Sequence, residues 1–176
     1  MRKLKLDELN RLNLEDYKAT VKLPVTIVLD NIRSAFNVGS IFRSSDAFLI
    51  ERVVLCGITS TPPHKEILKT AIGANRSVEW LYVNVAGKAL EQLKTENYCI
   101  IGIEQTTASI SLSEFKVDAN QKYAIVFGNE VEGLSKDILP LIDNFIEIPQ
   151  FGTKHSLNVS VCAGIVLYEF SEVLRK

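Results

Sequence analysis

Along most of the chain, short runs of apolar residues alternate with segments in which apolar residues recur at helical spacing. Short apolar runs that are rich in β-branched side chains and bounded by turn residues are typical of strands. The pattern predicts strands at residues 24–30, 52–58, 78–84, 98–104, 122–128 and 144–150. It predicts helices at residues 3–20, 38–49, 62–73, 87–97, 135–142 and 156–175. Residues 105–121 follow neither pattern.

The order of these elements indicates the fold class. Strands alternate with helices and several strands are almost wholly apolar, which is typical of a mostly parallel sheet with helices on both faces. A chain of 176 residues is long enough for one domain with a sizeable core. We therefore expect a single α/β domain with its ligands at the carboxyl ends of the strands. The pattern leaves the strand order open.

Composition narrows the class of protein further. The hydrophobic content of 47% and the charged content of 23% are ordinary, and no apolar run reaches the roughly 18 residues that a membrane span needs. The N-terminal segment alternates charge with leucine and lacks the apolar core of a signal peptide, so we expect a cytoplasmic protein with no membrane partner. A net charge of −1 provides no overall attraction for nucleic acid. Any RNA or DNA partner would therefore need a local basic patch.

Several common kinds of site are missing from the sequence. The nine glycines form neither G-x-G-x-x-G nor a P-loop, and no G-x-S-x-G nucleophile elbow occurs. Two histidines, His64 and His155, offer little for a metal site or a Ser-His-Asp arrangement, so we expect no metal. The three cysteines lie in apolar runs without a C-x-x-C pair, which indicates buried, reduced thiols.

Polar residues gather in residues 30–48, directly after the first predicted strand. Asn37 is either the N-cap of the following helix or a functional side chain. Arg43 lies on a helix that otherwise faces the core, and it either pairs with Asp46, three residues later, or faces a cleft.

Two more polar segments follow predicted strands. In "FGNEVEGLS", residues 127–135, the glycines suit a close backbone approach and a tight turn, and Glu130 lies between them. In "HSLNVS", residues 155–160, Ser156 is predicted to cap the last helix. Asn158 and Ser160 are less expected at a helix start, because their side chains compete with the helix backbone for hydrogen bonds. Core packing is the expected role of Ser160.

Together the three segments resemble the motifs of the SpoU (TrmH) family in the SPOUT superfamily of methyltransferases. Asn37, Gly39 and Arg43 match N-x-G-x-x-x-R, and residues 128–135 match G-x-E-x-x-G-L-S. Residues 156–160 match S-L-N-x-S. The motifs occur in the family's order, and the resemblance extends from Pro24 to the end of the chain.

The resemblance implies an α/β domain whose C-terminal part forms a deep trefoil knot around an S-adenosylmethionine site. It divides the chain into an N-terminal helical extension, residues 1–22, and a knotted catalytic core, residues 23–176. It also implies transfer of a methyl group to a ribose 2′-hydroxyl of tRNA or rRNA. The implied assembly is a homodimer in which each active site draws on both subunits.

The resemblance also implies roles for individual residues. Arg43 would activate the ribose hydroxyl or hold it together with a phosphate. Arg43 and the ribose would be oriented by Asn37, Ser156 and Asn158. Glu130 would hold Arg43 or shape its loop. The cofactor would contact mostly backbone at Glu104, Gln105, Thr106, Phe127, Gly128, Ile148 and Leu157. Basic residues in or near loops after strands are the candidates for RNA binding: Arg33, Arg43, His64, Lys65, Arg76 and Lys154.

Two alternative functions remain open at this point. The acidic balance of the chain favours a small-molecule α/β enzyme that uses the region of Arg43 and Glu130 as an anion site. A non-catalytic member of the same fold could bind RNA without methylating it.

Overall fold

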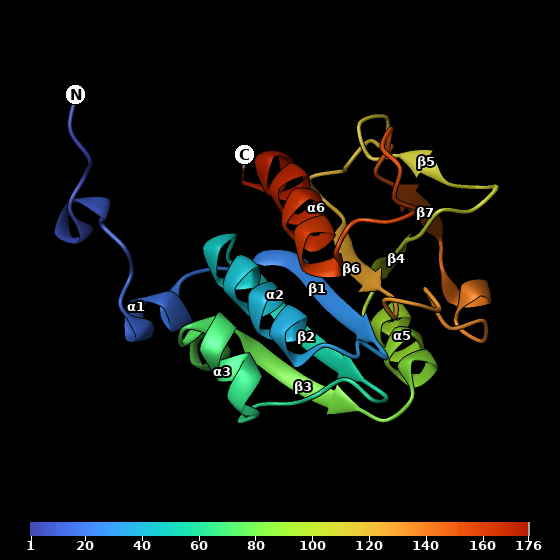
Figure 1. Cartoon of the computed structure of the whole chain (residues 1–176), viewed down its shortest axis with the longest axis horizontal. Coiled ribbons are helices and arrows are strands. Elements are labelled where there is room, and N and C mark those ends of the chain that lie inside the picture. The colour runs from blue at the N-terminus through green and yellow to red at the C-terminus, as the bar shows by residue number, and fades with distance from the viewer. Residues whose placement is uncertain (176) are drawn as a thin grey trace.

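The computed structural model describes residues 1–175, except for the side chains of residues 6 and 7. One sheet of seven parallel strands runs through the domain in the order β3-β2-β1-β6-β4-β7-β5 (Figure 1). The strands are β1 Leu23–Asp30, β2 Ile50–Cys56, β3 Glu79–Val83, β4 Tyr98–Ile103, β5 Ile110–Ser111, β6 Lys122–Phe127 and β7 Asn144–Glu147. The six predicted strands are confirmed, and the two-residue β5 lies in the stretch without a predicted pattern.

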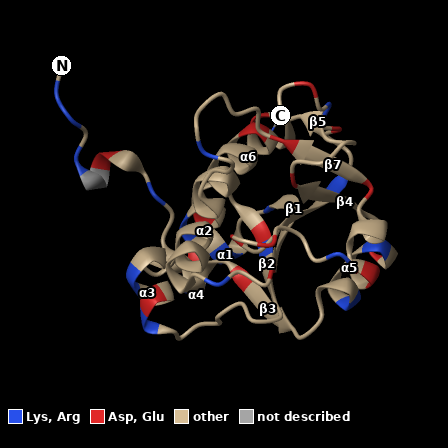
Figure 2. Ribbon diagram, turned by 45° about the vertical axis from the view of Figure 1, so that its right-hand side comes forward, with Lys and Arg blue, Asp and Glu red and all other residues tan. Residues whose placement is uncertain are grey.

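The helices flank the sheet on both faces. They are α1 Leu14–Ala19, α2 Ala35–Ala47, α3 Lys65–Ala71, α4 Ala74–Ser77, α5 Ala86–Thr95 and α6 Val159–Leu174, with short 3₁₀ helices η1 Leu6–Leu9 and η2 Leu139–Leu141. Figure 1 shows α2 and α6 side by side over one face, and the turned view of Figure 2 separates them from α5 across the sheet. No helix in the described part of the chain is long and apolar enough to cross a membrane.

Alternate side chains of the central strands point into two apolar cores. Val25, Ile27 and Leu29 of β1 pack under α2 and α6, whereas Val28 faces the core beneath α5. All four side chains are completely buried. Burial on both faces explains why these strands appear in the sequence as unbroken apolar runs rather than as alternating ones.

Several predicted helices have different bounds, because their ends depend on single capping side chains. The predicted helix at 3–20 is interrupted, since Asn10 adopts a left-handed conformation after η1 and Asn13 caps α1. The helix predicted at 62–73 begins only at Lys65, with His64 as its N-cap, so the prolines precede it. The helix predicted at 135–142 is reduced to the single turn of η2.

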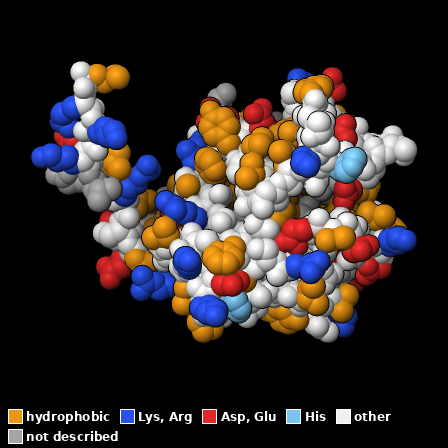
Figure 3. Space-filling view, in the orientation of Figure 1, with side chains coloured by type: hydrophobic (Ala, Val, Ile, Leu, Met, Phe, Trp, Pro, Cys, Tyr) orange, Lys and Arg blue, Asp and Glu red, His pale blue; other side chains and the backbone are white. Residues whose placement is uncertain are grey.

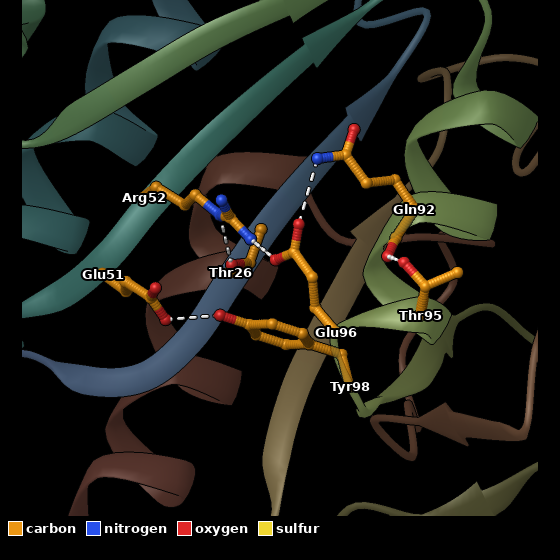
Figure 4. Close-up of polar contacts among 7 residues, drawn as sticks. All are labelled: Thr26, Glu51, Arg52, Gln92, Thr95, Glu96 and Tyr98. Atoms are coloured by element: carbon orange, nitrogen blue, oxygen red, sulfur yellow. Dashed lines mark hydrogen bonds and ion pairs between the residues drawn. The ribbon is translucent and has the colours of Figure 1, made fainter.

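A polar cluster anchors the ends of the strands that lie away from their carboxyl edge (Figure 4). Arg52 of β2 donates to the Thr26 hydroxyl of β1 at 3.1 Å and pairs with Glu96, directly after α5. The Tyr98 hydroxyl of β4 donates to Glu51 at 2.6 Å. The cluster therefore joins β1, β2, β4 and the end of α5.

Gly39 lets α2 approach α3 closely. A Cβ atom at this position would lie 2.1 Å from the Thr70 hydroxyl and 2.5 Å from the Ile67 carbonyl oxygen. Real Cβ atoms do not come so close to backbone, so a larger residue would force the two helices apart. This packing gives the glycine of the N-x-G-x-x-x-R motif a structural role.

We expect Gly39→Ala to lower the free energy of unfolding by about 1–3 kcal/mol, because the added methyl group overpacks a helix contact. Urea unfolding followed by circular dichroism measures this. Gly164→Ala in α6 is the matched control, since its Cβ would meet only the Ser44 hydroxyl at 3.9 Å. The control should be neutral or stabilising by up to about 1 kcal/mol. Equal effects of the two substitutions would contradict the helix contact.

Candidate functional site

A cavity of about 460 Å³ lies at the carboxyl ends of β4, β6 and β7. Backbone and side chains of the segments that follow these strands line it, together with the first residues of α6. The structure brings six of the seven residues predicted for the cofactor to its wall: Glu104, Gln105, Phe127, Gly128, Ile148 and Leu157. Thr106 lies outside the lining, because its hydroxyl and backbone bond to Ser109 and Ala108 within their own turn.

The loop after β6 folds tightly back on itself. Asn129 and Gly133 exchange two backbone hydrogen bonds of 2.9 and 3.0 Å. A Cβ on Gly128 would lie 2.3 Å from the carbonyl carbon of Gly133, and Gly133 has a positive φ of 70°. Both glycines of the motif are therefore required by the shape of the loop.

Glu130 connects this loop to the first turn of α2. Its carboxylate accepts hydrogen bonds from the backbone N–H of Arg33 at 2.9 Å, the backbone N–H of Ser34 at 3.1 Å and the Asn37 amide at 2.9 Å. Burial alone would raise the pKa of Glu130, but the donors at Arg33, Asn37 and Ser34 together lower the pKa below its ordinary value of 4.5. Of the two predicted roles, the hydrogen bonds fit shaping the loop, and none of them joins Glu130 to Arg43.

Asn37 and Asn158 extend the connection to α6. The Asn158 amide donates to the Asn37 side-chain oxygen at 3.1 Å. The Asn158 side-chain oxygen caps α6 by accepting from the backbone N–H of Ser160 at 2.9 Å and of Val161 at 3.4 Å. Three segments that are far apart in the sequence thus share one chain of hydrogen bonds, from Glu130 through Asn37 to Asn158.

The structure excludes the capping alternative for Asn37 and shows that the predicted Ser156 cap is wrong. Ser34, not Asn37, is the N-cap of α2, and its hydroxyl accepts from the Asn37 backbone N–H at 3.3 Å. Asn158, not Ser156, caps α6, which begins at Val159. Ser156 is exposed and lines the cavity instead. The Ser160 hydroxyl is half-buried and donates to the Asn158 side chain at 2.7 Å.

Arg43 lies outside the cavity lining. It lies six positions after Asn37, which places it about 9 Å further along α2 and about 120° around the axis. The proposed ion pair with Asp46 is absent, since Asp46 accepts from the Ser77 hydroxyl and the ion pairs among the described side chains do not include Arg43. Arg43 is exposed and faces a hollow between α2 and α3 that also contacts Gly164 of α6.

The sequence prediction missed the network behind the cavity. The fully buried Asp30 carboxylate, at the end of β1, accepts from the Ser135 backbone N–H and the Asn31 amide, both at 2.8 Å. The Asn129 amide donates to the Asn31 carbonyl at 2.7 Å. The available signal was a carboxylate at the end of an apolar strand, because a buried charge requires hydrogen-bond donors.

The candidate RNA-binding residues are all exposed but do not form one patch. Arg33 precedes α2, His64 and Lys65 start α3, Arg76 lies in α4, and Lys154 precedes α6. Figure 3 shows Lys and Arg side chains spread over the visible face, with acidic side chains between them. Neither this arrangement nor the cavity includes a group of metal-binding side chains within the described residues.

The fold and the cavity together define a class of protein: a parallel α/β domain with a cavity at the carboxyl ends of its strands and no glycine-rich phosphate loop in the sequence. Residues 24–168 match the SpoU rRNA Methylase family, and the chain belongs to this family.

Similar proteins agree with this assignment. A Staphylococcus saprophyticus protein assigned to the TrmH family of tRNA/rRNA methyltransferases is 32% identical over 152 residues, which cover 86% of this chain and 60% of that protein. A Staphylococcus aureus protein with the same assignment is 30% identical over 156 residues, which cover 89% of this chain and 62% of that protein. The chain thus spans less than two thirds of the length of these relatives.

Solved structures share the fold. The A. aeolicus TrmH/SpoU tRNA modifying enzyme superimposes with a TM-score of 0.80 at 26% identity, covering 92% of this chain and 82% of that one. An RNA 2′-O ribose methyltransferase has a TM-score of 0.75 at 26% identity, with coverage of 89% and 59%. AviRb from Streptomyces viridochromogenes, in complex with AdoMet, has a TM-score of 0.77 at 23% identity, with coverage of 89% and 63%.

We expect Glu130→Gln to lower the free energy of unfolding by about 1 kcal/mol at pH 7, because an ionised acceptor of three hydrogen bonds is lost. The folded-state pKa lies below 4.5, so the stabilisation is complete above that pH and disappears as the pH falls through the folded-state value. Urea unfolding at pH 7, 4.5 and 3 should show that the difference in free energy of unfolding between wild type and Glu130→Gln becomes smaller as the pH falls.

Glu132→Gln is the control, since this exposed residue of the same loop offers no side-chain acceptor to the first turn of α2. A loss of unfolding free energy in Glu130→Gln that is independent of pH, or equal to that of the control, would contradict the role of the Glu130 carboxylate.

Proposed function

We propose that the protein transfers a methyl group from S-adenosylmethionine to a ribose 2′-hydroxyl of tRNA or rRNA. The observation that carries the proposal is the chain of hydrogen bonds from Glu130 through Asn37 to Asn158 at the wall of the cavity. It joins one residue from each of the three segments that resemble the family's motifs. The similarity to an RNA 2′-O ribose methyltransferase supports the choice of the 2′-hydroxyl.

The residues of the cavity fit S-adenosylmethionine. Part of the lining is apolar and suits contact with an adenine ring, and the strand ends offer backbone groups for its edge; the apolar residues are Ile103, Phe127, Ile148 and Leu157. The glycines at 128 and 133 let the loop pack against its own backbone and against the Glu104 carboxylate at this wall. The bound cofactor supplies an electrophilic methyl group, and AviRb, which shares the fold, has been solved with AdoMet.

Arg43 handles the substrate in this proposal. An arginine guanidinium is in general a very weak base, so its more direct role is to hold a phosphate and the ribose hydroxyl by paired hydrogen bonds. The hydroxyl loses its proton as its oxygen attacks the methyl group, and Arg43 stabilises the developing negative charge. Asn37, Asn158 and Ser156 orient the ribose beside the cavity.

A second copy of the chain brings Arg43 to the reaction. Arg43 projects away from the cavity of its own chain, so we propose that it serves the cavity of a partner in a homodimer. The exposed apolar stripe on α6 supports this, because Val161, Ile165 and Tyr168 are 53%, 41% and 52% exposed and share one helix face. Figure 3 shows apolar side chains gathered over α6.

RNA would contact several separate basic sites. Its phosphates would meet the exposed residues Arg33, Arg43, His64, Lys65, Arg76 and Lys154, whose number doubles in a dimer. Residues 1–22 are proposed as an extension of the catalytic core at 23–176. The trefoil knot and the cytoplasmic location stay predictions.

Labelled S-adenosylmethionine offered with total tRNA and with rRNA tests the activity. We expect label in one of the two RNAs, at a 2′-O-methyl nucleotide found by mapping. Arg43→Ala should reduce incorporation at least about 100-fold while the Kd for S-adenosylmethionine changes less than about twofold. Lys116→Ala, which removes an exposed positive charge elsewhere, should retain activity.

No label in either RNA would contradict the proposed reaction and favour a small-molecule substrate. Loss of cofactor binding in Arg43→Ala would show that this residue belongs to the cofactor site.

Light scattering after size exclusion tests the assembly. The wild-type mass should be that of a dimer, and Ile165→Asp should give a monomer, because a buried carboxylate in the apolar stripe would lack a partner. Ile58→Asp is the control, since Ile58 is an exposed apolar residue on the loop after β2. A monomeric wild type would contradict the shared active site.

A further inference from the structure

The lining of the cavity has an unusual charge. Three carboxylates line it, from Glu104, Glu130 and Glu147, whereas no Lys or Arg does so among the described residues. We propose that Glu104 makes the cavity select the positively charged S-adenosylmethionine over its uncharged product, S-adenosylhomocysteine. The inference rests on the proposed function and adds a specificity-determining residue to it.

Glu104 is held in place by backbone on both sides. One carboxylate oxygen accepts from the Gln105 backbone N–H at 3.0 Å, and the other accepts from the Leu134 backbone N–H at 3.1 Å. A Cβ on Gly133 would lie 2.2 Å from this second oxygen. Only glycine at position 133 leaves room for the carboxylate, so the motif loop is shaped around it. Each oxygen keeps a free lone pair that can face the cavity.

Of the two other carboxylates in the lining, that of Glu130 is already engaged by hydrogen bonds. Glu130 uses both carboxylate oxygens on the first turn of α2, as described above. His155 presents its carbonyl oxygen, which accepts from the Gln105 amide at 2.9 Å. Glu147 lies at the end of β7 and is half-buried. The N-terminus of α6 carries a partial positive charge at this wall, and it suits the carboxylate of the ligand's amino acid part.

Methyl transfer changes the charge of the ligand. S-adenosylmethionine carries a sulfonium and an ammonium against one carboxylate, which gives a net charge of +1. In the reaction the S–CH₃ bond breaks with its electron pair left on sulfur, an O–CH₃ bond forms, and the proton of the hydroxyl passes to water. The sulfonium becomes a neutral thioether, so the product is uncharged overall. A fixed carboxylate therefore attracts the cofactor more than the product, and their exchange after each turnover is favoured.

Calorimetric titration of the purified full chain, without RNA, tests the inference. The ligands are S-adenosylmethionine, S-adenosylhomocysteine and sinefungin, in which a protonated amine replaces the sulfonium. We expect Glu104→Gln to weaken the binding of S-adenosylmethionine and sinefungin about tenfold and to change the affinity for S-adenosylhomocysteine less than about twofold. Glu132→Gln makes the same change in net charge outside the cavity lining and should leave all three affinities unchanged.

A wild-type titration in increasing NaCl gives a second measurement that needs no substitution. The affinity for S-adenosylmethionine should fall with salt more steeply than the affinity for S-adenosylhomocysteine. Equal weakening of all three ligands by Glu104→Gln would overturn the inference, because it would show a purely structural carboxylate. Equal salt dependence would overturn it as well. A wild type that binds none of the ligands would refute the proposed function itself.

Discussion

The carboxylate of Glu130 is the point at which the loop after β6 meets the first turn of α2. Three donors converge on it, two from the backbone before α2 and one from Asn37, and Asn37 passes the connection to Asn158 at the start of α6. Parallel strands end at one edge of the sheet but do not by themselves bring the following segments into contact. This short chain of hydrogen bonds does so, and the geometry of the cavity depends on it.

The small residues around this chain follow from the same constraint. Gly128 and Gly133 allow the loop to turn back on itself, and the space above Gly133 is occupied by the Glu104 carboxylate. Gly39 lets α2 pack closely against α3. This packing holds the first turn of α2, to which Glu130 binds. With α2 fixed in this way, Arg43 faces outward, away from its own cavity. We propose on this basis that a second chain supplies Arg43 to the cavity.

The sequence predicted the strands well and the helix ends poorly, for physical reasons. Burial on both faces leaves an unbroken apolar run, as in β1, and such a run is visible without any tertiary information. A helix start depends on which of several nearby polar side chains reaches a free N–H. The sequence therefore could not show that Ser34 rather than Asn37 caps α2, or that Asn158 rather than Ser156 caps α6. The strand order depends on crossovers that local patterns do not encode. The cavity residues came from the resemblance to a family, and the buried Asp30 network was overlooked.

The central claim is that the segments that follow β4, β6 and β7 form one ligand site. Hydrogen–deuterium exchange with and without S-adenosylmethionine tests it most directly, because amides near a bound ligand exchange more slowly. The account predicts slower exchange in residues 103–105, 127–134 and 147–158 together, with no change in α5 on the opposite face of the sheet. Protection confined to one of these segments, or protection of α5 instead, would contradict it.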